Sequence, residues 1–99
     1  MIKRSDVLRT IEDHKGEIKR LGVKRVGIFG SFARNAQVRG SDIDVLVEFH
    51  PKQKTFDHYM ELRDLLRRLL RREVDLVTRE ALKPGLKPAI LRDVRYAGL

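Results

Sequence analysis

The chain has 99 residues, of which 41% are hydrophobic and 36% are charged, a composition that predicts one globular domain spanning residues 1–99. It contains no cysteine, which excludes disulfide bonds and thiolate metal sites. The N-terminal segment has no long apolar run, so we expect no signal peptide, no contact with a membrane and a cytoplasmic location. The formal net charge of +8 favours an acidic partner, which nucleotide phosphates, nucleic acid or an acidic protein surface would each satisfy.

The N-terminal part of the chain predicts a helix followed by a strand. Ser5 and Asp6 are typical of the start of a helix, and Gly22 is typical of its end. Between them, apolar residues recur at helical spacing: Leu8, Ile11, Ile18 and Leu21. Residues 23–30 are rich in valine, isoleucine and phenylalanine and end at a glycine, so they predict a strand.

A short helix and a second strand are predicted next. Ser31 is a suitable N-cap for a helix that ends near Asn35. A loop containing Gly40 follows. Residues 42–49 then predict a strand, which Pro51 closes.

The second half of the chain predicts the longest helix, a third strand and a last helix. Thr55 and Asp57 begin the long helix, and its broad apolar stripe comprises Phe56, Tyr59, Met60, Leu62, Leu66, Leu69 and Leu70. Residues 73–78 predict a short strand, and residues 89–96 predict a helix after a loop rich in proline and glycine. This order of elements predicts an α/β (α+β) fold, in which helices cover a small mixed sheet of about three strands.

Three aspartates stand in or beside the apolar strands. Side chains alternate along a strand, so Asp42 and Asp44 point to the same face, about 7 Å apart. Two such carboxylates repel each other unless a cation lies between them, and hard oxygen ligands select Mg²⁺ or Mn²⁺. Asp75 joins them if its strand is their neighbour in the sheet. Three carboxylates together are what a two-metal phosphoryl-transfer site requires.

The Gly30-Ser31 pair supplies a possible phosphate cradle. Glycine lets the backbone approach a phosphate closely, and Ser31 offers a hydroxyl and an amide at the start of a helix. Arg34 and Arg39 lie in the following loop and are candidates for phosphate contacts. The sequence contains neither the P-loop motif nor the glycine-rich dinucleotide fingerprint.

Each of these features has a plainer interpretation when it is taken alone. A D-x-D pair at the end of a strand is often a solvated cap, and a Gly-Ser pair is often a simple turn. Asp75 alone could pair with an arginine. His14, His50 and His58 are interpreted as surface or half-buried residues rather than ligands. The functional interpretation therefore depends on the features occurring together and in order.

The segments GSFARN, SDIDVLVEF and EVDLVT, in this order, resemble the motif series of the DNA polymerase beta nucleotidyltransferase superfamily. The short length and nearly complete coverage, from Val23 to about Ala97, resemble more narrowly the minimal nucleotidyltransferases (MNT domains), the MntA-like antitoxin partners of HEPN toxins.

The resemblance assigns roles by position. The glycine-serine pair of the family matches Gly30 and Ser31, and its three metal-binding, catalytic carboxylates match Asp42, Asp44 and Asp75. Many members have A-R-G where this chain has alanine, Arg34 and asparagine, and many have a proline and an acid where this chain has arginine and glycine before S-D-I-D. Asparagine tolerates a left-handed turn, so we expect that turn to persist.

The activity that the resemblance implies is nucleotidyl transfer. Two Mg²⁺ ions would be held by the three aspartates, and AMP would pass from ATP to a tyrosine of a HEPN-type toxin, which would silence the toxin. A chain of 99 residues leaves no room for an acceptor-holding second domain, so we expect the acceptor to arrive on another protein, in a hetero-oligomer.

Two alternatives from other classes stay open. One is a non-catalytic antitoxin that neutralises its partner by binding alone. The other is a basic regulator that binds nucleic acid, which ranks last because the sequence shows no helix-turn-helix signal and only 6% aromatic residues.

Overall fold

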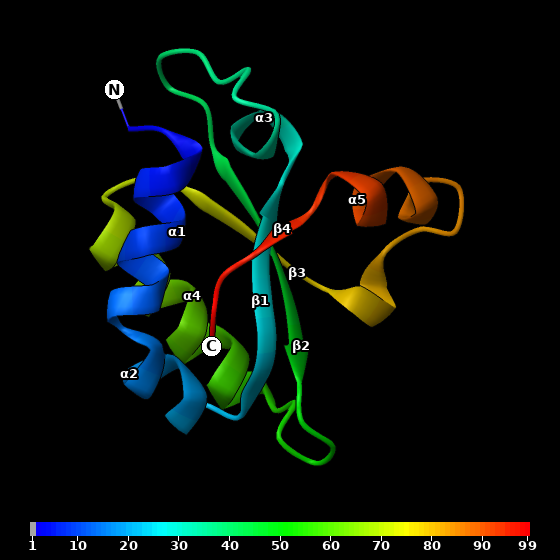
Figure 1. Ribbon diagram of the computed structural model, residues 1–99. Coiled ribbons are helices and arrows are strands. Elements are labelled where there is room, and N and C mark those ends of the chain that lie inside the picture. Colours follow the sequence, from blue (N-terminus) through cyan, green and yellow to red (C-terminus); the bar gives the residue numbers. More distant parts are fainter. Residues whose placement is uncertain (1) are drawn as a thin grey trace.

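The computed structural model describes residues 2–99 and contains a four-stranded mixed sheet in the order β3-β2-β1-β4 (Figure 1). The strands are β1 (Val23–Phe29), β2 (Ile43–Phe49), β3 (Val74–Thr78) and β4 (Arg95–Tyr96). The helices are α1 (Arg4–Asp13), α2 (Lys15–Arg20), α3 (Gly30–Ala33), α4 (Phe56–Leu70), the single 3₁₀ turn η1 (Arg79–Ala81) and α5 (Lys87–Asp93). The predicted fold class is confirmed, with one strand more than the sequence indicated. Across residues 2–99, no helix combines the length and apolarity needed to cross a membrane.

The connections in the sheet follow from the lengths of the linking segments. β1 and β2 pair antiparallel, and the short β4 pairs antiparallel with the other edge of β1. β2 and β3 pair in parallel, which requires a long crossover, and α4 provides it. The parallel register places Asp44 directly opposite Asp75.

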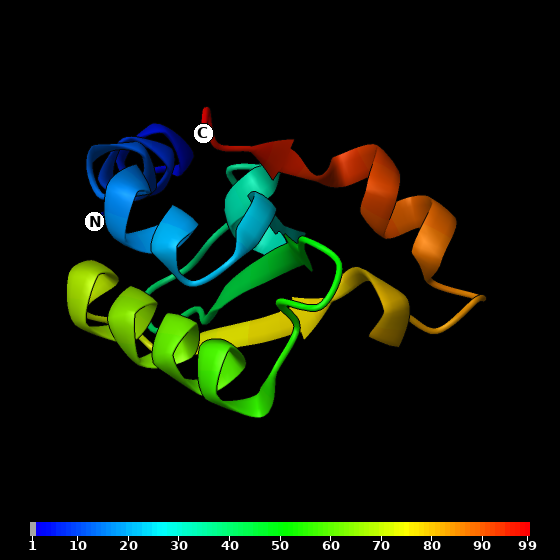
Figure 2. The same cartoon turned by 90° about the horizontal axis from the view of Figure 1, so that it is seen from below.

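The two faces of the sheet are covered differently. Ile43, Val45 and Val47 are fully buried in the main core together with residues of α1, α2 and α4. Leu46 faces the other way, into a smaller cluster beneath η1 and α5. Figure 2 shows α5 and α4 on opposite sides of the molecule. Each buried aliphatic side chain stabilises the fold by about 1.5–3 kcal/mol. The alternation predicted for residues 42–49 is therefore confirmed, and the aspartates lie on the face away from α4.

The predicted N-terminal helix is wrong in one respect, because it is broken at His14. The backbone of His14 leaves the helical region (φ −115°, ψ 22°), and its ring Nδ1 lies 2.9 Å from the carbonyl oxygen of Thr10. α2 therefore begins as a separate helix at Lys15. The break still lets Ile11 and Ile18 both reach the main core.

The predicted last helix is also wrong at its end. α5 ends at Asp93, and residues 95–96 form β4 instead of continuing the helix. Gly27 of β1 explains the close approach, because a Cβ atom there would lie 2.8 Å from the carbonyl oxygen of Arg95. The amide of Ala97 then donates to the carbonyl of Val26 at 2.9 Å, which extends the contact.

Two smaller expectations need correction. Ser31 is not an N-cap, because α3 begins at Gly30 and Phe29 occupies the capping position. Phe56 was expected in the apolar stripe of the long helix but is 77% exposed at the first position of α4. The N-cap of α4 agrees with the prediction: Thr55 accepts a hydrogen bond from the amide of His58.

Candidate active site

The paired strands β2 and β3 bring two carboxylates together. Asp44 and Asp75 are register partners, and neighbours in register on parallel strands place their side chains on the same face. Asp42 lies immediately before β2, two residues from Asp44, and so continues the same face. Asp44 is partly buried, whereas Asp42 and Asp75 are exposed. All three predicted carboxylates therefore lie along one end of one sheet face.

The electrostatics of this edge are unfavourable to ionised Asp44. Its pKa is raised, first by burial and then by the negative charges of Asp75 and Asp42, while the Arg34 guanidinium acts in the opposite direction. The three carboxylates are thus close enough for their charges to interact. An additional positive charge at this place would relieve the repulsion.

The donor set fits a hard divalent cation, although it is not assembled into a closed site. Carboxylate oxygens on an edge with excess negative charge are the ligands that Mg²⁺ and Mn²⁺ prefer. Among residues 2–99, however, no group of three or more acidic or histidine side chains is arranged to hold a metal ion. We infer that small side-chain rotations of Asp42, Asp44 and Asp75 would accompany cation binding.

Gly30 fits closely against Asp44. Gly30 has φ +70°, a left-handed conformation that glycine adopts without strain. A Cβ atom at this position would clash with the carboxylate of Asp44 and lie 3.1 Å from its Cγ. The glycine is therefore required both for the turn and for the space beside the carboxylate.

Ser31 follows in the first turn of α3, where backbone N–H groups have no partner within the helix. Because α3 has only four residues, its macrodipole is weak, and the attraction for an anion comes from these N–H groups. The predicted glycine-serine turn thus presents backbone donors beside Asp44.

Arg34 lies at the C-cap of α3 and contacts the last helix. Its Nη1 donates to Oδ2 of Asp93 at 2.9 Å. Asp93 was not identified from the sequence, because it lies 59 residues away in the chain and no local pattern links the two. The adjacent Asn35 takes the left-handed conformation expected of it, with φ 53°.

Two further arginines, Arg71 and Arg72, border the site at the end of α4, where cations favour a helix C-terminus. Arg71 and Arg72 line a hollow of about 210 Å³ together with Gly40, Ser41, Asp42 and Glu73. The backbone supports this arrangement, since the amide of Ile43 donates to the carbonyl of Glu73 at 3.0 Å. Residues 71–73, which follow α4, therefore lie against the segment that leads into β2.

The histidines stay apart from the aspartates, as the sequence suggested. His50 follows the far end of β2, and the Nδ1 atoms of His14 and His58 contact the backbone carbonyls of Thr10 and Gln53. The polar groups along this edge are thus carboxylates, backbone amides and arginines. Such a set can hold a cation and a polyphosphate together.

Comparisons with known proteins agree with this geometry. The family model described as "Nucleotidyltransferase domain" matches residues 11–97. A protein of Thermococcus cleftensis named protein adenylyltransferase MntA is 35% identical over 97 residues, covering 97% of each chain. The solved structure of a candidate minimal nucleotidyltransferase aligns with a TM-score of 0.81 at 31% identity, covering 95% of each chain.

A more distant likeness concerns the fold alone. The structure of a toxin–antitoxin complex with AMP-PNP aligns with a TM-score of 0.66 at 24% identity, covering 86% of this chain and 70% of that one. The assignment to a family rests on the family model, which matches residues 11–97, and on the Thermococcus relative. The chain belongs to the nucleotidyltransferase domain family and is a nucleotidyltransferase.

Proposed function

We propose that this nucleotidyltransferase uses Mg²⁺ to transfer AMP from ATP to a tyrosine of a HEPN-type toxin, and so acts as its antitoxin. The observation that carries the proposal is the register pairing of Asp44 with Asp75 beside the left-handed turn at Gly30. The name of the Thermococcus relative, protein adenylyltransferase, supports a protein acceptor. The toxin–antitoxin complex with AMP-PNP, which shares the fold, supports a nucleotide and a toxin partner.

The binding roles follow from position. Asp42, Asp44 and Asp75 would hold two Mg²⁺ ions, and Gly30 and Ser31 would bind the triphosphate through backbone donors. Bound Mg²⁺ supplies positive charge to the triphosphate and lowers the pKa of the acceptor hydroxyl. Arg34, near enough to lower the pKa of Asp44, would contribute its charge to the same phosphates.

The reaction is an in-line displacement at the α-phosphorus. The acceptor oxygen forms a bond to the α-phosphorus, the bond from that phosphorus to the oxygen bridging it to the β-phosphate breaks, and pyrophosphate leaves with the electron pair. The hydroxyl proton is released to water. β3 is an edge strand and Asp75 is exposed, so an acceptor on another chain can reach the carboxylates from this side.

The test uses α-labelled ATP, Mg²⁺ and the cognate partner protein, with the label located by tandem mass spectrometry. Asp42→Asn, Asp44→Asn and Asp75→Asn should each lose transfer. Asp13→Asn, an exposed aspartate at the end of α1, is the matched control and should retain it. Undiminished labelling by the Asp44→Asn protein would contradict the proposal.

A purely binding antitoxin is the second candidate. The likeness to the toxin–antitoxin complex, which shares the fold, is also what an antitoxin that acts by covering its partner would show. This candidate predicts that Asp44→Asn protein, present at equal abundance, neutralises the toxin as well as the wild type does. Loss of neutralisation by a folded Asp44→Asn protein would exclude it.

A further inference from the structure

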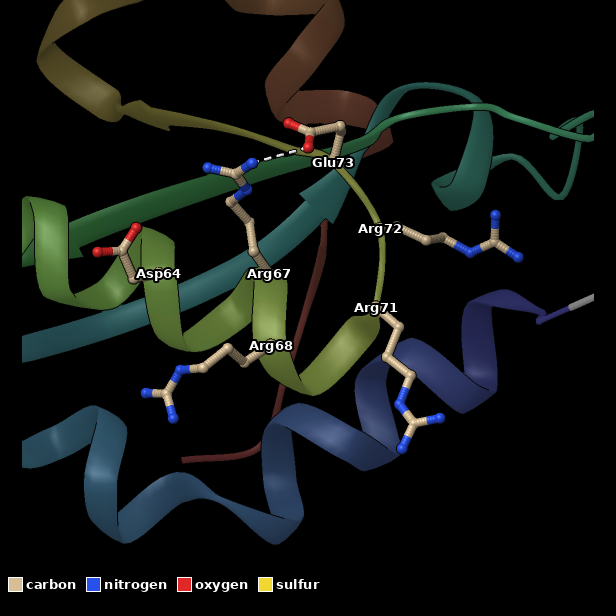
Figure 3. A pocket seen from close by; sticks show the side chains of 6 residues that line it. All are labelled: Asp64, Arg67, Arg68, Arg71, Arg72 and Glu73. Atoms are coloured by element: carbon tan, nitrogen blue, oxygen red, sulfur yellow. Dashed lines mark hydrogen bonds and ion pairs between the residues drawn. The ribbon is translucent and has the colours of Figure 1, made fainter.

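Four arginines gather where α4 ends and define what we term the arginine cluster: Arg67, Arg68, Arg71 and Arg72. With Asp64 and Glu73 they line an open hollow of about 730 Å³ (Figure 3). The residues that line this hollow include none of Asp42, Asp44 and Asp75, and the binding roles assigned above use none of its arginines.

Two of the four arginines in the cluster, Arg68 and Arg71, have no ion-pair or aromatic partner among residues 2–99. Within residues 2–99, Arg67 is the member with an ion pair, donating through Nη2 to Oε1 of Glu73 at 2.8 Å. Arg68 and Arg71 are exposed, and Figure 3 shows them on the side of the helix end away from Glu73. The guanidinium of Arg72 lies 5.9 Å from the ring centroid of Phe32. Two guanidinium groups therefore face solvent without a fixed partner.

Helix stability alone does not explain the arginine at position 71. Arg71 is the C-cap of α4 and has left-handed backbone angles (φ 54°, ψ 38°), a place where glycine is usual. The left-handed conformation costs a residue with a side chain about 1–2 kcal/mol. A cation at a helix C-terminus recovers only about 0.3–1 kcal/mol when exposed. The end of α4 therefore gains less from the Arg71 guanidinium than the backbone conformation of Arg71 costs.

The cluster is continuous with the carboxylates. Arg71, Arg72 and Glu73 line both this hollow and the smaller one that contains Asp42. A chain segment bound along the end of α4 would therefore lead to the start of β2, where Asp42 and Asp44 lie.

We propose that the arginine cluster is the docking surface for an acidic segment of the acceptor protein. The inference rests on the proposed transfer to a protein acceptor and names the chemistry that recognises it. Guanidinium groups match carboxylates with two parallel hydrogen bonds, which gives orientation as well as attraction. Docking at this surface holds the acceptor hydroxyl near the open edge of β3.

The lining of the hollow favours a protein segment over a nucleic acid. Asp64 and Glu73 are interspersed with the arginines, and a regular phosphate backbone would meet their negative charges. The residues that line the hollow include no aromatic side chain on which bases could stack. An acidic peptide can place its carboxylates on the arginines and neutral side chains elsewhere.

The experiment measures binding by fluorescence anisotropy. The probes are a labelled glutamate-rich peptide containing one tyrosine, the same peptide with glutamine in place of glutamate, and a single-stranded oligonucleotide of equal charge. The proteins are the wild type, the double variant Arg68→Glu/Arg71→Glu, and the control Lys15→Glu/Lys24→Glu. The control changes net charge equally at two exposed lysines that line neither hollow.

We expect the wild type to prefer the glutamate-rich peptide to both other probes. The arginine variant should bind it about ten-fold more weakly, and the control should differ little from the wild type. In the transfer reaction, the single variant Arg68→Glu, whose side chain does not line the hollow that contains Asp42, should raise KM for the acceptor protein and leave KM for ATP unchanged.

Three outcomes would overturn the inference. The first is that both double variants bind the glutamate-rich peptide equally weakly. The second is that the wild type binds this peptide no better than its glutamine counterpart. The third is that the wild type binds the oligonucleotide more tightly than the peptide and that the arginine variant loses this oligonucleotide binding. The last would assign the surface to nucleic acid. Because the binding measurements need no ATP, a failure of AMP transfer alone would count against the proposed function and not against this surface.

Discussion

Asp44 is the residue whose ionisation works against the fold. Its pKa is raised, first by burial and then by Asp75 and Asp42, so the folded state binds a proton more readily than the unfolded state does. The protonated Asp44 carboxyl therefore contributes to the free energy of unfolding at low pH. This contribution is lost as the pH rises from 3.8, the ordinary pKa of the carboxyl, through its raised pKa in the folded protein. This direction is opposite to that of a carboxylate held in an ion pair.

Asp44→Asn should therefore stabilise the metal-free protein at neutral pH. The free energy of unfolding of the variant should exceed that of the wild type by a difference that grows with pH above about 4 and then levels off. The measurement is urea denaturation across the acidic range in the presence of a chelator. A constant difference at every pH would show that repacking, and not ionisation, is responsible.

The same substitution should remove activity while stability rises. Loss of a hydrogen-bonding neighbour of a metal ligand costs about 10- to 100-fold, so loss of the ligand itself should cost at least 100-fold in kcat/KM. The labelled-ATP assay at saturating Mg²⁺ measures this. Opposite changes in stability and activity in one variant are the signature of a group retained for chemistry.

Position 30 requires glycine because of its left-handed backbone conformation and because the Asp44 carboxylate leaves no room for a Cβ atom. Gly30→Ala would place a side chain in the left-handed region, at a cost of about 1–2 kcal/mol, and would push the Asp44 carboxylate aside. We expect a lower unfolding free energy and a loss of transfer greater than the loss of folded protein explains. Gly40→Ala is the control, since Gly40 also has positive φ but a Cβ atom there meets nothing within 4 Å. Equal activity in the two variants would remove Gly30 from the site.

The ion pair between Arg34 and Asp93 joins α3 to α5. Arg34 is also a predicted phosphate-binding residue, so the ion pair engages a guanidinium that the nucleotide would use. Its partners are 55% and 38% exposed, so it contributes less than about 1 kcal/mol to stability. Asp93→Asn should release Arg34 and lower KM for ATP, whereas Arg34→Ala should raise KM for ATP. Steady-state kinetics at fixed acceptor concentration distinguish the two. Changes of the same sign in both variants would mean that the pair positions α5 and that Arg34 does not touch the nucleotide.

The elements that the sequence predicted are those with strong local patterns. β1, β2 and β3 stand out as apolar runs, and α4 has an amphipathic stripe with a threonine cap. β4 has only two residues and forms because Gly27 lets the C-terminal segment approach. A glycine inside an apolar strand is the signal that could have indicated this contact. The break at His14 has no comparable local signal.

At the scale of the whole molecule, the sequence predicted which residues form the site but not how the fold brings them together. Alternation along residues 42–49 fixed which face Asp42 and Asp44 share, and the apolar neighbours of Asp75 marked a strand. That β3 lies beside β2 depends on where the α4 crossover returns, which only the tertiary structure shows. Arg71 and Arg72 reach the site through the same crossover, so their local pattern indicated only a helix end.

Because Asp42 and Asp75 are exposed and their carboxylates are solvated, Mg²⁺ alone should bind weakly. Ligand oxygens from a triphosphate would complete the coordination, so Mg²⁺ and a non-hydrolysable ATP analogue should bind together far better than either does alone. A ligand at about 100 times its Kd raises the unfolding free energy by about 2.7 kcal/mol.

Thermal denaturation should therefore show a small shift with Mg²⁺, a small shift with the analogue, and a shift larger than their sum with both. Asp44→Asn should lose this excess, because the repulsion that the cation relieves is already absent, and Asp13→Asn should keep it. Calcium, which is larger and tolerates irregular coordination, should stabilise the complex without supporting transfer. A full shift with Mg²⁺ alone would mean that the carboxylates close on the ion without help from the nucleotide.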